Sequence, residues 1–179
     1  MIFSKKLVDW YKVNKRDLPW RDISSAYRIW ISEIILQQTK VSQGLPYYLK
    51  FIDTFPKVDD LANANLDNVM KIWQGLGYYS RARNMHVTAK IIVNDYNGEF
   101  PNDYTQILAL PGIGPYTAAA ISSFAFNLPH AVVDGNVVRV LSRFFGLNLD
   151  FNSKIGKEKF YELADKCLIK NNPSLYNSA

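Results

Sequence analysis

Apolar residues recur every three or four positions along almost the whole chain, which is the spacing that places them on one face of an α-helix. Within residues 26–55, Ile29, Trp30, Ile34 and Ile35 follow this spacing. The alternation typical of strands is not found, and neither is an internal repeat. Besides 26–55, the stretches that predict helices are 59–77 (two short ones), 80–98, 104–110, 116–126, 135–146 and 156–171. The pattern predicts an all-α fold of about nine or ten helices.

Several helix ends are also marked in the sequence. Asp67 is expected to cap the second short helix of 59–77, because Asp favours that position. Gly98 is expected to end the helix that begins near residue 80, and Asn102 or Asp103 to start the next one.

The composition allows a sizeable core, since 48% of the 179 residues are hydrophobic and 14% are aromatic. No apolar run approaches the roughly 20 residues that cross a bilayer, and the charged N-terminus does not resemble a signal peptide. A single cysteine, Cys167, excludes an internal disulfide and a cysteine-based metal cluster within this chain. These features predict a cytoplasmic protein that enters no membrane. Lys and Arg number 21 against 16 Asp and Glu, and the net charge of +5 favours a polyanionic partner.

The stretch "LPGIGPYTAAA" predicts a tight hairpin between two helices. Gly112 and Gly114 permit backbone conformations and close approaches that other residues resist. Pro111 is expected to end the first helix, and Pro115 suits the first turn of the second. Free N–H groups at the start of that second helix would form a site for an anion such as a phosphate. A tight turn without any ligand explains the same residues.

Asp134 follows the apolar residues of "HAVV" and precedes a glycine and a predicted helix. It is well suited to cap that helix. Because it follows the hairpin by only 20 residues (134 − 114), its carboxylate could also face a nucleic-acid strand held there. A fixed carboxylate beside a sugar stabilises an oxocarbenium-like transition state.

A helix-hairpin-helix followed by a Gly/Pro-rich loop and an aspartate resembles the endonuclease-III-like DNA glycosylase superfamily. The resemblance implies base flipping and cleavage of the N-glycosidic bond, with Asp134 as a catalytic residue and Asn136 near the sugar. Bifunctional relatives carry a lysine at the position of Tyr116, where it forms a Schiff base with the sugar. Tyrosine cannot do so, and Tyr116 therefore predicts a monofunctional glycosylase.

Two further stretches, "WISEIILQQTKV" and "WQGLGYYSRARN", resemble the adenine DNA glycosylases that remove adenine mispaired with 8-oxoguanine. The resemblance implies that Glu33 is the general acid that protonates the departing adenine and helps to activate water. From its spacing among apolar neighbours, Glu33 lies either on an exposed helix face or in a pocket with a raised pKa.

The same resemblance implies a DNA-contacting surface. Gln38, on the same helix as Glu33, is expected in the base stack, and Tyr78 is expected to wedge beside 8-oxoguanine. Trp20 and Arg21 are expected to line the adenine pocket. A monovalent cation, Na⁺ or K⁺, is implied at the carbonyls of Leu108, Leu110 and Ile113. The full set of expected DNA contacts is Gln37, Gln38, Thr39, Leu76, Tyr78, Arg81, Arg83, Pro111, Gly112, Ile113, Gly114 and Arg139, with Arg143 as a further phosphate contact.

The resemblance implies two helical lobes. Residues 22–131 would form a six-helix bundle with the helix-hairpin-helix at about 105–126, and residues 1–21 with 132–179 a second lobe, incomplete at its C-terminus. Relatives usually continue with four cysteines that bind a [4Fe–4S] cluster, and with a Nudix-like domain that recognises 8-oxoguanine. We expect a catalytic-core fragment truncated before the iron–sulfur segment, with no cofactor of its own.

The expected function is hydrolysis of adenine opposite 8-oxoguanine or guanine in double-stranded DNA, by a monomer in the bacterial cytoplasm and nucleoid. Two alternatives remain. A thymine or uracil mismatch glycosylase on the same scaffold also fits Tyr116. A helix-hairpin-helix DNA-binding module without catalysis is the other, although Glu33 and Asp134 argue against it.

Overall fold

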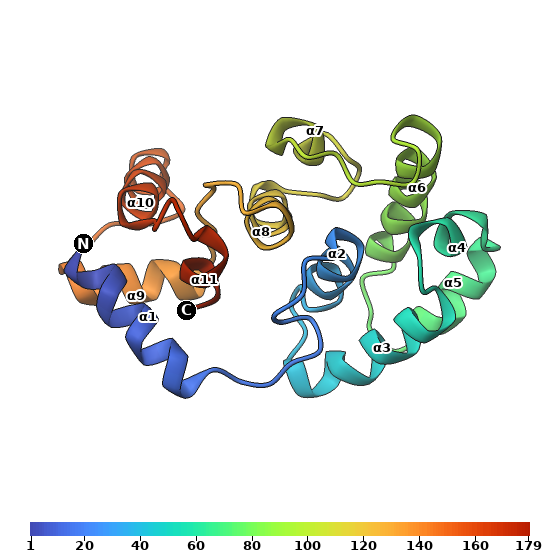
Figure 1. Ribbon diagram of the computed structural model, residues 1–179, viewed down its shortest axis with the longest axis horizontal. Coiled ribbons are helices and arrows are strands. Elements are labelled where there is room, and N and C mark those ends of the chain that lie inside the picture. The colour runs from blue at the N-terminus through green and yellow to red at the C-terminus, as the bar shows by residue number, and fades with distance from the viewer. The chain divides into compact units, whose positions relative to one another are not determined.

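The computed structural model describes residues 1–179 and consists of helices and connecting segments without strands (Figure 1). This confirms the predicted all-α class. The helices are α1 (Ile2–Asn14), α2 (Ala26–Ile35), α3 (Val41–Thr54), α4 (Val58–Asn63), α5 (Leu66–Trp73), α6 (Ser80–Asp95), α7 (Tyr104–Leu108), α8 (Pro115–Phe126), α9 (Gly135–Phe145), α10 (Lys154–Cys167) and α11 (Pro173–Ser178). The predicted stretches correspond to α2–α10, whereas α1 and α11 were not predicted, which explains the lower expected count. None of the helices is long and apolar enough to cross a membrane.

Most of the predicted helix ends are confirmed. Asp103 caps α7 by accepting a hydrogen bond from the amide of Gln106 at 2.9 Å. Gly98 follows the end of α6 with a φ of +79°. The predicted cap at Asp67 is wrong, because α5 has already begun one residue earlier. Asn65 is the cap, and its side chain accepts from the amide of Asp67 at 2.9 Å.

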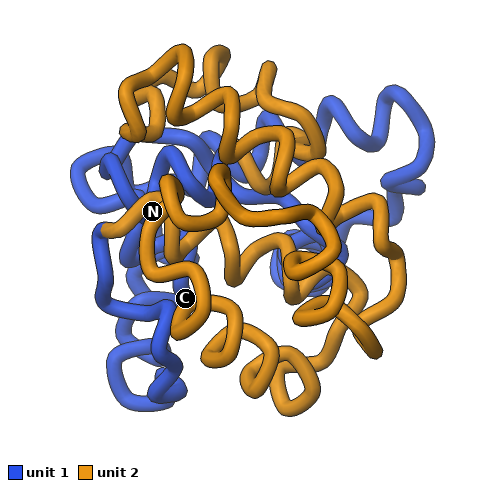
Figure 2. Tube along the Cα trace, turned by 90° about the vertical axis from the view of Figure 1, so that its right-hand side faces the viewer, with its two compact units in different colours: residues 1–24, 119–179 blue, residues 25–118 orange.

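The chain divides into two compact units (Figure 2). One is residues 25–118, and the other combines residues 1–24 with 119–179. The boundary at residue 118 falls inside α8, so that one helix contributes to both units. The lobes expected from the sequence, with boundaries at 21/22 and 131/132, stay a prediction.

In the unit 25–118, α2 is a largely buried helix. Seven of its ten residues are buried, so it has no wide polar face. Its Trp30 packs edge-on against Phe100 with ring centroids 5.3 Å apart, and the Tyr27 hydroxyl donates to the carbonyl of Phe55 at 2.7 Å. Within this unit, α2 contacts α3, and α3 contacts α5. Both α4 and α5 contact α6. Each large side chain buried here contributes about 1.5–3 kcal/mol.

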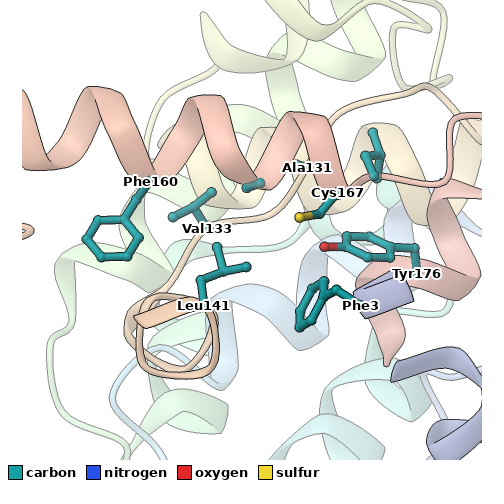
Figure 3. Close-up of a cluster of buried hydrophobic side chains, with 9 residues drawn as sticks. Phe3, Ala131, Val133, Leu141, Phe160, Cys167 and Tyr176 are labelled. Atoms are coloured by element: carbon teal, nitrogen blue, oxygen red, sulfur yellow. The ribbon is translucent and has the colours of Figure 1, made fainter. Parts of the chain in front are cut away.

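The other unit is built on the buried cluster drawn in Figure 3. Phe160 of α10, Leu141 of α9 and Phe3 of α1 meet in it, and they are 0%, 1% and 5% exposed. Cys167 and Tyr176 lie side by side in the same cluster and share a hydrogen bond. The two ends of the sequence are thereby packed together in one core.

His86 on α6 is a buried titratable group. Its Nε2 lies 3.0 Å from the carbonyl oxygen of Ala64, and only 5% of the residue is exposed. Burial, followed by the charge of Lys90, lowers the pKa of His86 below its ordinary value. The unfolded chain then binds this proton more readily than the folded protein. The contribution of His86 to stability is therefore complete above the ordinary histidine pKa and is lost as the pH falls through the lowered value.

We expect the free energy of unfolding, measured by urea titration, to be smaller at about pH 5 than at about pH 7.5. In His86→Gln the fall should be smaller, because the group that takes up the proton is gone. An equal fall in both proteins would assign the pH dependence to other groups.

Candidate active site and nucleic-acid interface

Glu33 lies in the second half of α2, a largely buried helix of the unit 25–118. Its side chain is half-buried, between Ser32 and Ile34, which are 1% and 3% exposed. The sequence allows an exposed face or an enclosed pocket, and the structure gives an intermediate environment. A carboxylate that is partly shielded from water yet still accessible meets the steric requirement for a general acid.

The residues that follow Glu33 do not continue the helix, and the expectation that they lie on it is wrong. α2 ends at Ile35, and Gln37 to Thr39 form a turn. Gln38 has a φ of +55°, in the left-handed region where helices commonly end. The hydroxyl of Thr39 donates to the carbonyl of Gln37 at 3.2 Å and closes the turn on itself.

Arg81, in the first turn of α6, closes the end of α2. Its guanidinium donates five hydrogen bonds to the backbone carbonyls of Ile34 (2.8 Å), Ile35 (3.2 Å), Gln37 (2.7 Å), Leu76 (3.3 Å) and Gly77 (3.3 Å). Carbonyls at a helix C-terminus have no amide partner within the helix, and a cation there also complements the helix dipole. Burial lowers the pKa of Arg81. The carbonyl bonds offset the cost of removing the charge from water.

The loop between α5 and α6 presents Tyr78. Trp73 donates from its ring nitrogen to the carbonyl of Gly77 at 2.9 Å, and Tyr47 donates to the carbonyl of Gln74 at 3.0 Å. Tyr78 itself is 64% exposed and has a φ of +46°. Its ring is therefore displayed to solvent on a loop that several side chains hold from behind.

Two residues near Tyr78 in the sequence differ in their exposure to solvent. Leu76, expected to contact DNA beside Tyr78, is only 7% exposed and packs into the unit. Tyr79, which follows Tyr78 directly, is 38% exposed. In this short loop Leu76 is therefore buried, and both Tyr78 and Tyr79 are exposed.

The predicted hairpin lies between α7 and α8, and Pro115 is the first residue of α8, as expected. Gly112 has a φ of +76°, and a Cβ there would lie 2.7 Å from the Cβ of Asn84 on α6. Thr88, one turn farther along α6, donates to the carbonyl of Pro111 at 2.8 Å. Gly114 differs, because a Cβ there would meet nothing within 4 Å. Gly112 thus allows the hairpin to approach α6 closely, and Gly114 borders open space.

Asp134 caps α9, as the sequence suggests. Its Oδ1 accepts from the amides of Asn136 and Val137 at 2.9 and 2.8 Å, and its Oδ2 accepts from the side chain of Asn136 at 3.2 Å. The segment before it is pinned by Asn177, whose amide donates to the carbonyl of His130 at 2.8 Å and accepts from the amide of Val132 at 3.2 Å. The carboxylate is half-buried and held at both oxygens.

Residues 31–166 match the family model described as HhH-GPD superfamily base excision DNA repair protein. This range contains Glu33, the Gln38 turn, the Tyr78 loop, the hairpin and Asp134. The chain belongs to the HhH-GPD superfamily.

Curated relatives of this HhH-GPD chain are named adenine DNA glycosylase. One from Buchnera aphidicola subsp. Baizongia pistaciae is 48% identical over 151 residues, 84% of this chain and 43% of the relative. One from Buchnera aphidicola subsp. Acyrthosiphon pisum is 41% identical over 177 residues, 98% of this chain and 51% of the relative. The mouse protein is 39% identical over 186 residues, 99% of this chain and 36% of the relative. The chain thus spans about half the length of the bacterial relatives.

Solved structures show the same fold. A thermostable thymine-DNA glycosylase is 31% identical with a TM-score of 0.86, and the match covers 99% of this chain and 85% of the other. A non-covalent endonuclease III–DNA complex is 19% identical with a TM-score of 0.81, over 99% and 80% of the two chains. The predicted glycosylase fold is confirmed.

The remaining candidate residues of the HhH-GPD chain lie on its surface or just beneath it. Tyr116, in the first turn of α8, is half-buried. Trp20 is 7% exposed, and the Arg21 guanidinium lies over the ring of Phe124, 5.7 Å from its centroid. Such a pair is a cation–π contact. The other arginines expected at phosphates are Arg83, Arg139 and Arg143, and all three are exposed.

The residues of this chain do not fit an iron–sulfur cluster. Such a cluster is held by about four cysteine thiolates, and Cys167 is the one cysteine present, buried in the core of its unit. No group of three or more His, Cys, Asp or Glu side chains is placed to bind a metal ion. For the monovalent cation, the Leu110 carbonyl already accepts from the amide of Ile113 at 3.2 Å, although a carbonyl has a second lone pair.

Sequence reasoning missed the supporting side chains of the site. Asn84 lies close to Gly112 of the hairpin, Thr88 bonds the hairpin, Tyr47 bonds the Tyr78 loop, and Asn177 bonds the segment before Asp134. Asn84 is the last residue of the stretch "WQGLGYYSRARN", and the other three belong to no motif. The one available signal was a pair of polar residues at helical spacing in "RARNMHVT", which is typical of a solvated face as well.

The two hairpin glycines predict opposite tolerance to alanine. Gly112→Ala places a side chain at positive φ and against Asn84, and we expect a loss of about 2 kcal/mol or more in the free energy of unfolding. Gly114→Ala meets neither obstacle, and its effect should stay within about 1 kcal/mol. Urea titration of both variants measures the difference. Equal losses would show that the backbone conformation at Gly112 does not limit stability.

Proposed function

We propose that this chain is the catalytic core of a monofunctional adenine DNA glycosylase. The choice of adenine rests on the curated relatives, which carry that name at 37–48% identity over 84–98% of this chain in three Buchnera lineages. The expected substrate is double-stranded DNA with adenine opposite 8-oxoguanine or guanine. Such a substrate implies work at the bacterial nucleoid, and the chain is expected to act as a monomer.

Glu33 is the proposed general acid. Cleavage breaks the bond between the sugar C1′ and the adenine nitrogen, and the bonding electrons leave with the base. An unprotonated adenine is a poor leaving anion, so a proton from Glu33 to the base facilitates its departure. The resulting glutamate can then take a proton from the water that adds to C1′. The half-buried setting of Glu33 on α2 supports this role.

Asp134 is the proposed carboxylate beside the sugar, where positive charge develops in the transition state. Its Oδ1 already accepts two amide hydrogen bonds, whereas Oδ2 accepts one from Asn136. Oδ2 therefore has more remaining acceptor capacity and is the oxygen we assign to the sugar. Asn136 would hold that oxygen in place. Tyr116 offers no amine, so strand cleavage through a Schiff base is not expected.

The proposed DNA contacts are the Gln38 turn, the Tyr78 loop and the hairpin. A Cβ at Gly114 would meet nothing within 4 Å, which supports space for a phosphate at the start of α8, where the helix dipole favours an anion. Arg83, Arg139 and Arg143 are proposed phosphate contacts, and Trp20 with Arg21 the lining of the adenine pocket. Leu76 is proposed to support the loop from beneath. A Na⁺ or K⁺ ion at the hairpin carbonyls stays a prediction.

A thymine or uracil mismatch glycosylase is the second candidate. The observation in its favour is the thymine-DNA glycosylase structure, which is 31% identical to this chain with a TM-score of 0.86. The adenine relatives are more similar in sequence, which is why we rank adenine first.

Single-turnover release of base from 8-oxoG·A, G·A, G·T and G·U duplexes tests the proposal. The assay should use the chain and a chimera that continues with the C-terminal part of the relative from Buchnera aphidicola subsp. Baizongia pistaciae. We expect adenine release from the first two duplexes, and a loss of about 100-fold or more in Glu33→Gln, because the proton donor is removed. Release from G·T or G·U alone would establish the second candidate.

Two substitutions of Asp134 distinguish its role as the cap of α9 from its proposed role in catalysis. Asn caps a helix as well as Asp, so Asp134→Asn should keep the stability, whereas Asp134→Ala should lose about 1 kcal/mol. Both should lose base release to a similar extent, since both lack the carboxylate. Intact DNA binding with no release from any duplex would instead support a binding module without catalysis.

A further inference from the structure

Two of the residues proposed to enter the DNA share an unusual backbone conformation. Gln38 and Tyr78 both have positive φ, at +55° and +46°. The other non-glycine residues with positive φ are Asp or Asn, which tolerate this region well. Glutamine and tyrosine do not share that tolerance, so the surrounding structure must hold both residues in place.

The same guanidinium contacts the peptide group in front of each residue. Nη1 of Arg81 donates to the carbonyl of Gln37 at 2.7 Å, and Nη2 donates to the carbonyl of Gly77 at 3.3 Å. These carbonyls belong to the peptide bonds that lead into Gln38 and Tyr78. Fixing a peptide group fixes the direction in which the next residue leaves it.

The guanidinium also lies against aromatic rings. Its carbon is 5.1 Å from the ring centroid of Trp73 and 5.6 Å from that of Tyr78. Trp73 in turn donates to the carbonyl of Gly77, one of the acceptors of Arg81. Arg81 therefore contacts both the backbone and the side chain of the Tyr78 loop.

We infer that Arg81 is a positioning residue that holds Gln38 and Tyr78 as one unit, so that the two enter the duplex together. This inference rests on the proposed function. The planar guanidinium reaches both carbonyls with two separate nitrogens, whereas the single ammonium of lysine cannot hold two segments in that geometry. The role differs from the phosphate contact expected from the sequence, because the donors of Arg81 are directed at protein carbonyls.

Hydrogen exchange of the protein without DNA tests the structural part. In Arg81→Lys, we expect the amides of residues 34–40 and of residues 74–80 to exchange about tenfold faster or more, while those of the hairpin keep their rates. The matched control is Arg28→Lys, an exposed arginine on α2. It should leave both segments unchanged. Faster exchange in one segment only, or in neither, would overturn the inference.

Single-turnover kinetics test the functional part. Positioning predicts that Arg81→Lys lowers the rate at saturating 8-oxoG·A duplex and leaves the affinity for undamaged duplex and its salt dependence intact. Tyr78→Ala should cost about tenfold or more in the wild-type protein, and less than about threefold in the Arg81→Lys background. A phosphate contact would instead weaken binding to every duplex and reduce the salt slope by about one. That result would overturn the inference.

Two further readouts keep the test decisive. If Arg81→Lys unfolds the protein, the rate of base release is measured instead for Gln38→Ala, Tyr78→Ala and the double variant, all with Arg81 intact. A double variant no slower than the slower single variant supports one unit, and additive losses overturn it. If the wild-type protein releases no base from any duplex, the proposed function fails, and the exchange rates still decide whether Arg81 joins the two segments.

Discussion

The hydrogen bonds between Arg81 and the C-terminal carbonyls of α2 are the interaction on which the proposed DNA-binding face depends. The guanidinium of Arg81 donates hydrogen bonds to the carbonyls of Ile34 and Gln37, which would bond backbone amides if α2 continued for another turn. It also donates to the carbonyl of Gly77 in the loop before α6. Placing a residue other than glycine at positive φ costs about 1–2 kcal/mol. A multiply bonded, half-buried cation can offset such costs, because each hydrogen bond to a charged group contributes about 1.5–3 kcal/mol. The strained turn and the strained loop are thus stabilised by one group.

α6 supports more than this one interaction. Arg81, Asn84 and Thr88 are spaced by three and four residues and therefore share one face of the helix. The first holds the Gln38 turn and the Tyr78 loop, and the other two contact the hairpin. Functional segments mounted on a regular element are held more accurately than segments mounted on other loops. Within residues 25–118, the three segments proposed to touch DNA share this one support.

The sequence predicts what is locally encoded. The helices follow from apolar spacing, and Pro115 and Asp134 reveal helix starts because their covalent structure favours those positions. The end of α2 was not predicted, because Gln37–Thr39 contain no stop signal. The group that accounts for the turn, Arg81, lies 44 residues away from Gln37. Polar residues on α6 likewise resemble a solvated face, because pattern alone does not show that a hairpin covers them. Long-range polar contacts are the part that periodicity cannot supply.

The positive φ at positions 38 and 78 has a consequence for natural variation. β-Branched side chains are poorly tolerated there, and Gly, Asn and Asp fit with little strain. Purifying selection at these two codons would therefore arise from backbone geometry even if the side chains never met a base. Evolutionary constraint at such sites is a sum of two pressures, one on shape and one on chemistry. A narrow set of accepted residues at these two positions would therefore reflect the backbone conformation as much as any contact with a base.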